Sequence, residues 1–145
     1  MLENWQSIAE QIYMNELTFP HLRERLQHGG ELRAWYKYYR GGNQWAGKHF
    51  MEENVFLMEE VLIWVQIAED GKMGLYSFKL DDISKIDRSY TFADKSQEKL
   101  VLSQATATFK TMKDNRKRDT LVFKRPLPAE EGDVEGFEQL IALLD

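Results

Sequence analysis

The sequence predicts an α+β fold in which N-terminal helices pack on an antiparallel β-barrel or sandwich that a C-terminal helix caps. Three observations lead to this prediction. Over residues 1–40, apolar side chains recur every three or four positions, which is typical of amphipathic helices. Over residues 54–125 they alternate with polar ones, which indicates strands. Over residues 133–145 the helical period returns.

The first two helices are predicted from apolar spacing and from the glycines that end them. One face of the first helix would hold four residues at positions i, i+3, i+4 and i+7, namely Trp5, Ile8, Ala9 and Ile12. Pro20 fits the first turn of the second helix, because proline there removes no hydrogen bond that the helix needs. Gly29 and Gly30 then end this helix.

The segment ELRAWYKYYR, residues 31–40, predicts a third helix that ends at Gly41-Gly42. On a helix its apolar side chains would share one face: Leu32, Trp35, Tyr36 and Tyr39. Its cations would share another, solvated face: Arg33, Lys37 and Arg40. An aromatic stripe at this spacing indicates packing against a sheet or a partner chain. The alternative is a stacking platform for bases or sugars, which aromatic residues interleaved with cations also bind.

The alternating region divides into strands at short polar turns. In VLIWVQIA, residues 61–68, four β-branched side chains take one face, namely Val61, Ile63, Val65 and Ile67. Asp70-Gly71 follows directly and is a hairpin signal. Further strands are predicted at MGLYSFKL (73–80), DISKIDRSY (82–90), KLVLSQATATFK (99–110) and TLVFKR (120–125). Pro126 and Pro128 end the sheet region, because proline donates no hydrogen bond to a ladder.

The last helix begins after Asp133, a residue type that caps helix N-termini. Its apolar stripe is Phe137, Leu140, Ile141 and Leu144. The change of period near residue 50 divides the chain into a helical N-terminal extension, residues 1–48, and an antiparallel β domain with its C-terminal helix, residues 49–145.

Composition narrows the class of protein. The 145 residues are 43% hydrophobic and include no cysteine, so disulfides, thiolate metal sites and cysteine nucleophiles are excluded. The net charge of −5 argues against a general nucleic-acid binder, which would have a basic surplus. Polar residues follow Met1 closely and no apolar run approaches the ~20 residues of a membrane helix. We therefore expect a soluble, cytoplasmic protein.

The segment GGNQWAGKH, residues 41–49, resembles a phosphate-binding P-loop in its Gly42-x-x-x-x-Gly47-Lys48 spacing. His49 stands where the motif needs the Ser or Thr hydroxyl that holds Mg²⁺. A P-loop also follows a buried strand in a parallel sheet, whereas here a predicted helix precedes the glycines and short turns join the later strands. We interpret the segment as a connector.

Two groups of residues are candidates for a metal or catalytic site. His21, Glu24 and His28 lie near one face of the second helix, a spacing that could hold zinc. Zinc-hydrolase helices instead place two histidines at i and i+4 with a glutamate between, so we expect solvent-exposed side chains and no metal or cofactor. The acidic pairs are Glu52-Glu53, Glu59-Glu60 and Asp81-Asp82. Neighbours on a strand point to opposite faces, so no catalytic acid–base pair is predicted.

The most concentrated charge lies in the turn KTMKDNRKRD, between two predicted strands. Its basic residues are Lys110, Lys113, Arg116, Lys117 and Arg118. Such a turn could bind a phosphate, a lipid headgroup or an acidic partner. The simpler interpretation is a solvated hairpin tip whose charges keep the sheet edge from pairing. These residues are nevertheless the best ligand-site candidates in the sequence.

The order of elements from residue 50 onward resembles the pleckstrin-homology-like superfold, particularly its compact GRAM and bacterial variants. The resemblance is carried by NVFLMEEVLIWVQI, LYSFKLDDISKIDRSY, KLVLSQATATFK with TLVFKR, and the final GFEQLIALL. It covers about two-thirds of the chain. Phe137 stands where many members have tryptophan, and the first hairpin loop offers only Lys72 to a phosphorylated headgroup. The resemblance therefore implies a non-enzymatic scaffold for protein contacts in a small protein of bacterial type.

We expect a binding or interaction module whose partner is a protein. The alternative is recognition of an anionic ligand or membrane surface through the basic turn, and an enzyme of unknown class is the third hypothesis, because a fold alone never excludes chemistry. The sequence does not identify the partner or the oligomeric state.

Overall fold

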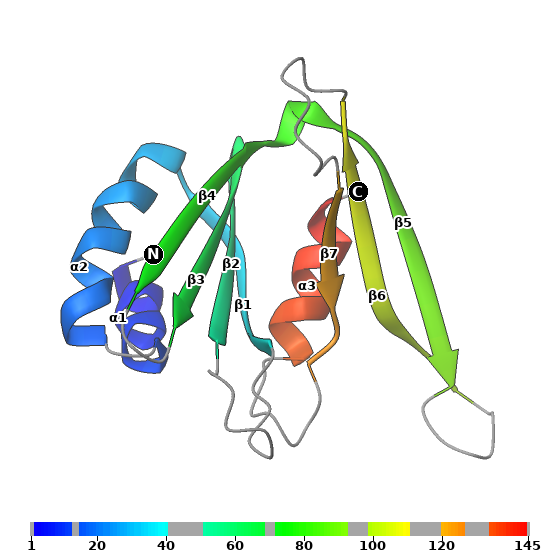
Figure 1. Cartoon of the computed structure of the whole chain (residues 1–145), viewed down its shortest axis with the longest axis horizontal. Coiled ribbons are helices and arrows are strands. Elements are labelled where there is room, and N and C mark those ends of the chain that lie inside the picture. The colour runs from blue at the N-terminus through cyan, green and yellow to red at the C-terminus, as the bar shows by residue number, and fades with distance from the viewer. Residues whose placement is uncertain are drawn as a thin grey trace.

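The computed structural model describes residues 2–12, 15–40, 51–68, 72–92, 99–110, 120–126 and 134–144. These residues form three α-helices and two antiparallel sheets (Figure 1). The helices are α1 (Leu2–Gln11), α2 (Asn15–Leu26) and α3 (Val134–Leu144). The first sheet contains β1 (Leu32–Arg40), β2 (Met51–Met58), β3 (Val61–Ala68) and β4 (Met73–Lys79) in that order. The second contains β5 (Ile83–Phe92), β6 (Leu100–Phe109) and β7 (Thr120–Lys124). The predicted α+β class with a C-terminal helix is confirmed.

The chain passes from the first sheet to the second through a short 3-10 turn, Leu80–Asp82. The Leu80 N–H donates to the Glu60 carbonyl at 3.0 Å, and the Lys110 N–H donates to the Asp82 carbonyl at 2.8 Å. These bonds hold the turn against both sheets. Figure 1 shows the sheets diverging from this corner with α3 between them. The described strands form two separate sheets and not a closed barrel.

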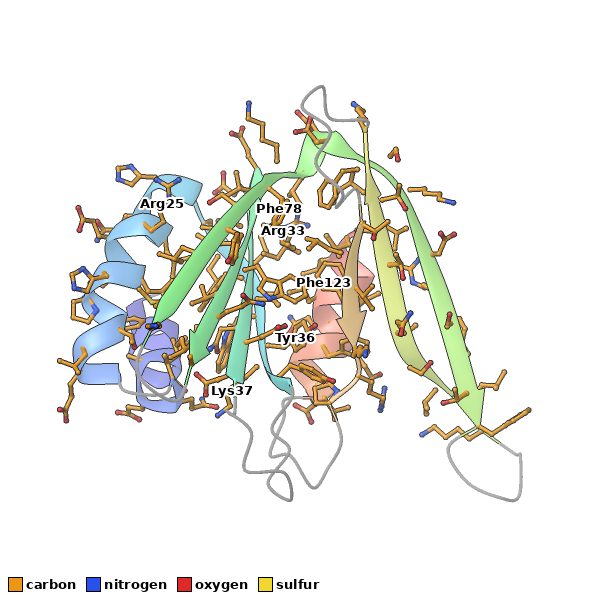
Figure 2. The ribbon with its side chains drawn as sticks, viewed as in Figure 1. Arg25, Arg33, Tyr36, Lys37, Phe78 and Phe123 are labelled. Atoms are coloured by element: carbon orange, nitrogen blue, oxygen red, sulfur yellow. The ribbon has the colours of Figure 1, made fainter. Side chains whose placement is uncertain are left out.

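An aromatic core fills the space between the sheets and α3. The rings of Tyr36 and Phe137 meet edge to face with centroids 5.5 Å apart, and those of Trp64 and Phe123 lie 5.3 Å apart. Both distances are typical of favourable ring pairs. Figure 2 shows Tyr36, Phe78 and Phe123 between the two sheets. The buried residues of this inner core are Ala34, Tyr36, Val55, Leu57, Leu62, Trp64, Ala105, Ala107, Phe123, Phe137, Leu140 and Ile141.

A second core lies on the other face of the first sheet, under α1 and α2 (Figure 1). Its buried residues are Ile8, Ile12, Leu22, Leu26, Phe56, Met58, Ile63, Val65 and Ile67. Strand β3 contributes to both cores, because alternate side chains point to opposite faces. Ile63 faces the helices, whereas Leu62 and Trp64 face α3. The predicted alternation of residues 61–68 is confirmed, and it reflects burial on both sides of the sheet.

The prediction of a helix at residues 31–40 is wrong, because residues 32–40 form strand β1. This strand pairs with β2 along its length, from Leu32 opposite Met58 to Arg40 opposite Met51. Ala34 and Tyr36 face the inner core, while Trp35 between them packs on the outer one. Tryptophan and tyrosine favour strands, and burial on both faces outweighs the helical spacing. Residues 1–48, predicted as a helical extension, therefore include a strand of the first sheet.

The predicted position of Pro20 in a first helical turn is also wrong. Helix α2 begins at Asn15, so Pro20 lies in its second turn. Glu16 is favourable in the first turn, since a carboxylate there meets the positive pole of the helix. No helix among the described residues is long and apolar enough to cross a membrane.

Candidate functional site

Most of the predicted basic site lies outside the described residues. Lys113, Arg116, Lys117 and Arg118 fall in residues 111–119. Lys110 is described and exposed, directly after β6. Arg125, on the other side of the turn, donates to the Leu102 carbonyl at 3.2 Å and pairs with Glu138 of α3 at 3.1 Å. Arg125 therefore joins the second sheet to α3.

The P-loop-like segment, residues 41–49, also lies outside the described residues, but the elements that it connects are clear. It joins β1 to β2, which are antiparallel neighbours in one sheet. A P-loop instead leads from a strand into a helix. The prediction of a helix before the glycines is wrong, because β1 precedes them. The interpretation as a connector is supported by the strand that follows at Met51.

The other residues considered for metal binding or catalysis do not come together. His21, Glu24 and His28 are exposed on α2 and the turn after it. In the part of the chain that the structure describes, no three His, Cys, Asp or Glu side chains form a group that could hold a metal ion. Glu59, in the turn between β2 and β3, accepts the Glu31 N–H at 2.9 Å and so holds the start of β1.

A buried polar network lies on the face of the first sheet that α1 covers. Asn54 is fully buried, and its Oδ1 accepts the Trp35 indole N–H at 3.0 Å. Its Nδ2 donates to Glu52 Oε2 at 2.9 Å. Glu52 is itself only 2% exposed. Both ends of the Asn54 amide are therefore satisfied, as a buried polar side chain requires.

Lys37 connects this network to α1. Its Nζ lies 3.8 Å from Glu52 Oε1 and donates to the carbonyl of Gln11, the last residue of α1, at 3.1 Å. An ammonium group is favourable there, because helix C-termini carry partial negative charge. The predicted solvated basic face is wrong at Lys37, whose side chain is 13% exposed. The arrangement clamps α1 to strands β1 and β2.

Glu53 points to the opposite face of β2 and has a separate partner. It is 1% exposed and accepts the Gln66 side-chain N–H at 3.1 Å from the neighbouring strand. Glu52 and Glu53 thus form no shared acid–base pair, as the alternation of a strand requires.

The alternating pattern predicted a strand only from Asn54 onward, so the burial of Glu52, Glu53 and Asn54 was not predicted. Extending the alternation back to Met51 would have placed Glu52 and Asn54 on one face and Glu53 on the other. Burial of all three also needs both sheet faces to be covered, which the sequence pattern of β2 alone does not show.

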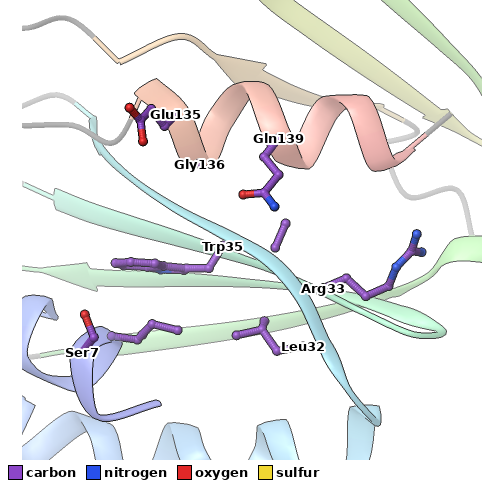
Figure 3. A pocket seen from close by; sticks show the side chains of 9 residues that line it. Ser7, Leu32, Arg33, Trp35, Glu135, Gly136 and Gln139 are labelled. Atoms are coloured by element: carbon purple, nitrogen blue, oxygen red, sulfur yellow. The ribbon is translucent and has the colours of Figure 1, made fainter. Parts of the chain in front are cut away.

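A cavity of about 320 Å³ lies beside β1, between α1 and α3 (Figure 3). The strand contributes Leu32, Arg33, Ala34 and Trp35 to its lining. The helices contribute Ser7, Ile8, Glu135, Gly136 and Gln139. The lining therefore combines the edge of the sheet with a cation, a carboxylate and an amide.

Three large apolar side chains are exposed at the end of the β5–β6 hairpin. Tyr90 is 55% exposed, Phe92 50% and Leu100 57%. Tyr90 and Phe92 are two residues apart on β5, and Leu100 on β6 lies directly opposite Phe92, so all three share one face. Leu102, opposite Tyr90, continues this face into the inner core. We call Tyr90, Phe92 and Leu100 the hairpin-end face.

Figure 1 shows the end of the hairpin at lower right, away from α3 and the first sheet.

The fold and these surfaces define an α+β protein of two antiparallel sheets with a buried polar clamp, an edge cavity and an exposed apolar face. A comparison with protein-family models, curated proteins and solved structures finds no match.

Proposed function

We propose that this protein is a non-enzymatic interaction module that binds a protein partner through the hairpin-end face. The observation that carries the proposal is the exposure of Tyr90, Phe92 and Leu100 on one face of two paired strands. Among the described residues only two other large apolar side chains are comparably exposed, Leu17 and Tyr76. The exposed apolar surface is therefore concentrated at one place.

The chemistry of this face suits a protein partner. Tyrosine is enriched among the residues that contribute most to protein–protein binding, and aromatic rings bury a large area with few rotatable bonds. Strand β5 is also the last strand of its sheet, so the described structure leaves one of its edges without a neighbouring strand. A partner can contact the apolar side chains and this edge together.

The resemblance to pleckstrin-homology-like domains supports the same function. Sheets of four and three antiparallel strands with a C-terminal helix between them are compatible with that superfold. A scaffold of this kind, small and bacterial in type, presents strands and loops to other proteins. We infer the role from this likeness and from the hairpin-end face together.

The alternative function is binding of an anionic ligand through the basic turn. Lys110, the described member of that set, is exposed at the end of β6. Binding through this turn would weaken steeply as salt screens exposed charges, whereas binding through an apolar face would not. Ionic strength therefore separates the two functions.

The test is affinity capture with the full chain as bait, followed by quantitative mass spectrometry at low and high salt. The test variant is Tyr90→Ser with Phe92→Ser, and Leu17→Ser is the matched control because Leu17 is 64% exposed on α2. We expect wild type and the Leu17 variant to retain the same partner at high salt, and the test variant to lose it. If all three retain the same proteins, the hairpin-end face is not the binding surface.

The basic turn is tested in the same way with Arg116→Glu, Lys117→Glu and Arg118→Glu together. Loss of partners or of anionic vesicles in this variant, with Tyr90 and Phe92 intact, would support the alternative instead.

A further inference from the structure

We propose that the cavity beside β1 binds a short extended peptide segment. The segment adds to the edge of β1 that faces away from β2, with an acidic side chain at Arg33 and a basic side chain at Glu135. This site shares no residue with the hairpin-end face, so it goes beyond the proposed function and its test is independent.

The first element of the site is the edge of β1. This strand is the last in the four-stranded sheet and pairs on one side with β2. Within the described ranges, no backbone hydrogen bond reaches residues Leu32 to Trp35 from the side away from β2. An edge strand presents outward N–H and C=O groups, and an extended peptide can pair with them.

The second element is the pair of walls that flank this edge. Ser7 and Ile8 of α1 lie on one side, and Glu135, Gly136 and Gln139 of α3 on the other. The volume of about 320 Å³ is near the lower end of the ~300–1,000 Å³ typical of small-ligand sites, and the space is partly open to solvent. A few residues of extended chain match this space, with a side chain directed to each wall.

The third element is a pair of opposite charges, Arg33 of β1 and Glu135 of α3. Arg33 and Glu135 are both exposed, and neither makes a side-chain hydrogen bond or ion pair within the described part of the chain. Figure 3 shows them toward opposite ends of the cavity, with Gln139 between them. A peptide with an acidic side chain at one end and a basic side chain at the other would neutralise both groups. The Gln139 side-chain amide is placed to hydrogen-bond the peptide backbone.

The register of β1 explains the position of Arg33 and limits the length of the ligand. Leu32 lies opposite Met58 and Ala34 opposite Leu57, so Arg33 is an extra residue in a β-bulge. A bulge redirects its side chain and discourages a long neighbouring strand from pairing. A short segment that pairs beside Ala34 and Trp35 avoids this obstacle.

The direction in which the peptide pairs sets the order of its charged residues. Antiparallel pairing is slightly more stable than parallel pairing. A peptide antiparallel to β1 places its C-terminal end beside Arg33, and its N-terminal end toward Trp35 and Glu135. The preferred ligand therefore has its basic residue first and its acidic residue last.

The probes are two N-acetylated, C-amidated peptides of identical composition, Lys-Val-Thr-Val-Asp and Asp-Val-Thr-Val-Lys. Each is titrated into the full ¹⁵N-labelled chain and followed by NMR. We expect Lys-Val-Thr-Val-Asp to bind more tightly and to shift the amide signals of Ala34, Trp35 and Gln139. In the charge-swapped variant, Arg33→Glu with Glu135→Arg, affinity for this peptide should fall about tenfold, the size expected when two exposed ion pairs become repulsive.

The charge-swapped variant should in turn prefer Asp-Val-Thr-Val-Lys. The matched control is Arg23→Glu with Glu24→Arg, which makes the same exchange on the exposed surface of α2. It should bind as wild type does. The proposal is overturned if neither peptide shifts the β1 signals at millimolar concentration, if both bind equally to wild type and to the swapped variant, or if the control variant changes the preference. A circular dichroism spectrum of each variant checks the fold.

Discussion

Trp35 on β1 donates its indole N–H to Asn54 on β2 at 3.0 Å, across the two strands and on the face covered by α1. Because the Asn54 amide also donates to Glu52, the three side chains form one continuous network. A shift of β2 by one residue would move Asn54 to the opposite face, where this network is lost. The bond therefore helps to specify how the first two strands pair.

Replacing Asn54 with alanine should lower the free energy of unfolding by about 2–4 kcal/mol, because a buried acceptor and a buried donor are lost together. Urea denaturation measures the change. Ser84→Ala is the control, since its hydroxyl donates to the Thr108 carbonyl at an exposed site, and it should lose no more than about 1 kcal/mol. Equal losses in the two variants would contradict a stabilising role for the network.

Lys37 and Glu52 should show strong energetic coupling. Lys37→Met leaves the buried Glu52 carboxylate with one cation fewer, and we expect a loss of about 2–4 kcal/mol. Adding Glu52→Gln should restore part of the stability, giving a coupling of about 1–3 kcal/mol in a double-mutant cycle. The control cycle uses Lys85 and Asp87, whose side chains are 64% and 63% exposed. That pair should couple by less than about 1 kcal/mol. Similar coupling in both cycles would show that burial does not strengthen the Lys37–Glu52 pair.

The strands of the second half could be predicted from the sequence because their environment matches their pattern. In β3 successive residues face the two cores in turn. Ile63 faces the core under α1 and α2, and Trp64 faces the inner core, so the period of two continues along the strand. The same holds for α3, where Phe137, Leu140 and Ile141 are buried at helical spacing. Where a segment has a single side-chain period and the fold buries the apolar face that this period defines, its secondary structure can be predicted from the sequence.

Strand β1 could not be predicted in this way because its residues satisfy two periods at once. Trp35 and Tyr36 fit a helical stripe, but Ala34 and Tyr36 also fit one face of a strand. The choice is made by contacts with distant residues, since Tyr36 packs on Phe137, about a hundred positions away. The cavity beside β1 could not be predicted either, because Ser7, Arg33 and Glu135 are far apart in the sequence and line one pocket only in the folded chain.

Phe137→Ala should destabilise the protein by about 3–5 kcal/mol, the usual range for removing a buried phenylalanine ring. Phe137 is fully buried, and its ring meets Tyr36 edge to face. Chemical denaturation measures the loss, and Phe137→Leu, which refills part of the space, should lose less. A change below about 1 kcal/mol in the alanine variant would mean that α3 is not an essential part of the inner core.

Gly30→Ala should destabilise the turn before β1 through two separate effects. The backbone of Gly30 has φ of 84° and ψ of −148°, a region that residues with a Cβ rarely adopt, and the strain costs about 1–3 kcal/mol. A Cβ there would also lie 3.1 Å from the Glu59 side-chain carboxyl carbon, which must move and so weaken the bond to the Glu31 N–H. Making the same change in a Glu59→Ala background removes the second effect but not the first. We therefore expect Gly30→Ala to cost less in that background, by about 1 kcal/mol, while most of the backbone cost persists. Urea denaturation of wild type, the two single variants and the double variant measures the backbone cost and the cost of moving Glu59. If Gly30→Ala is as stable as wild type, the positive φ of Gly30 is contradicted.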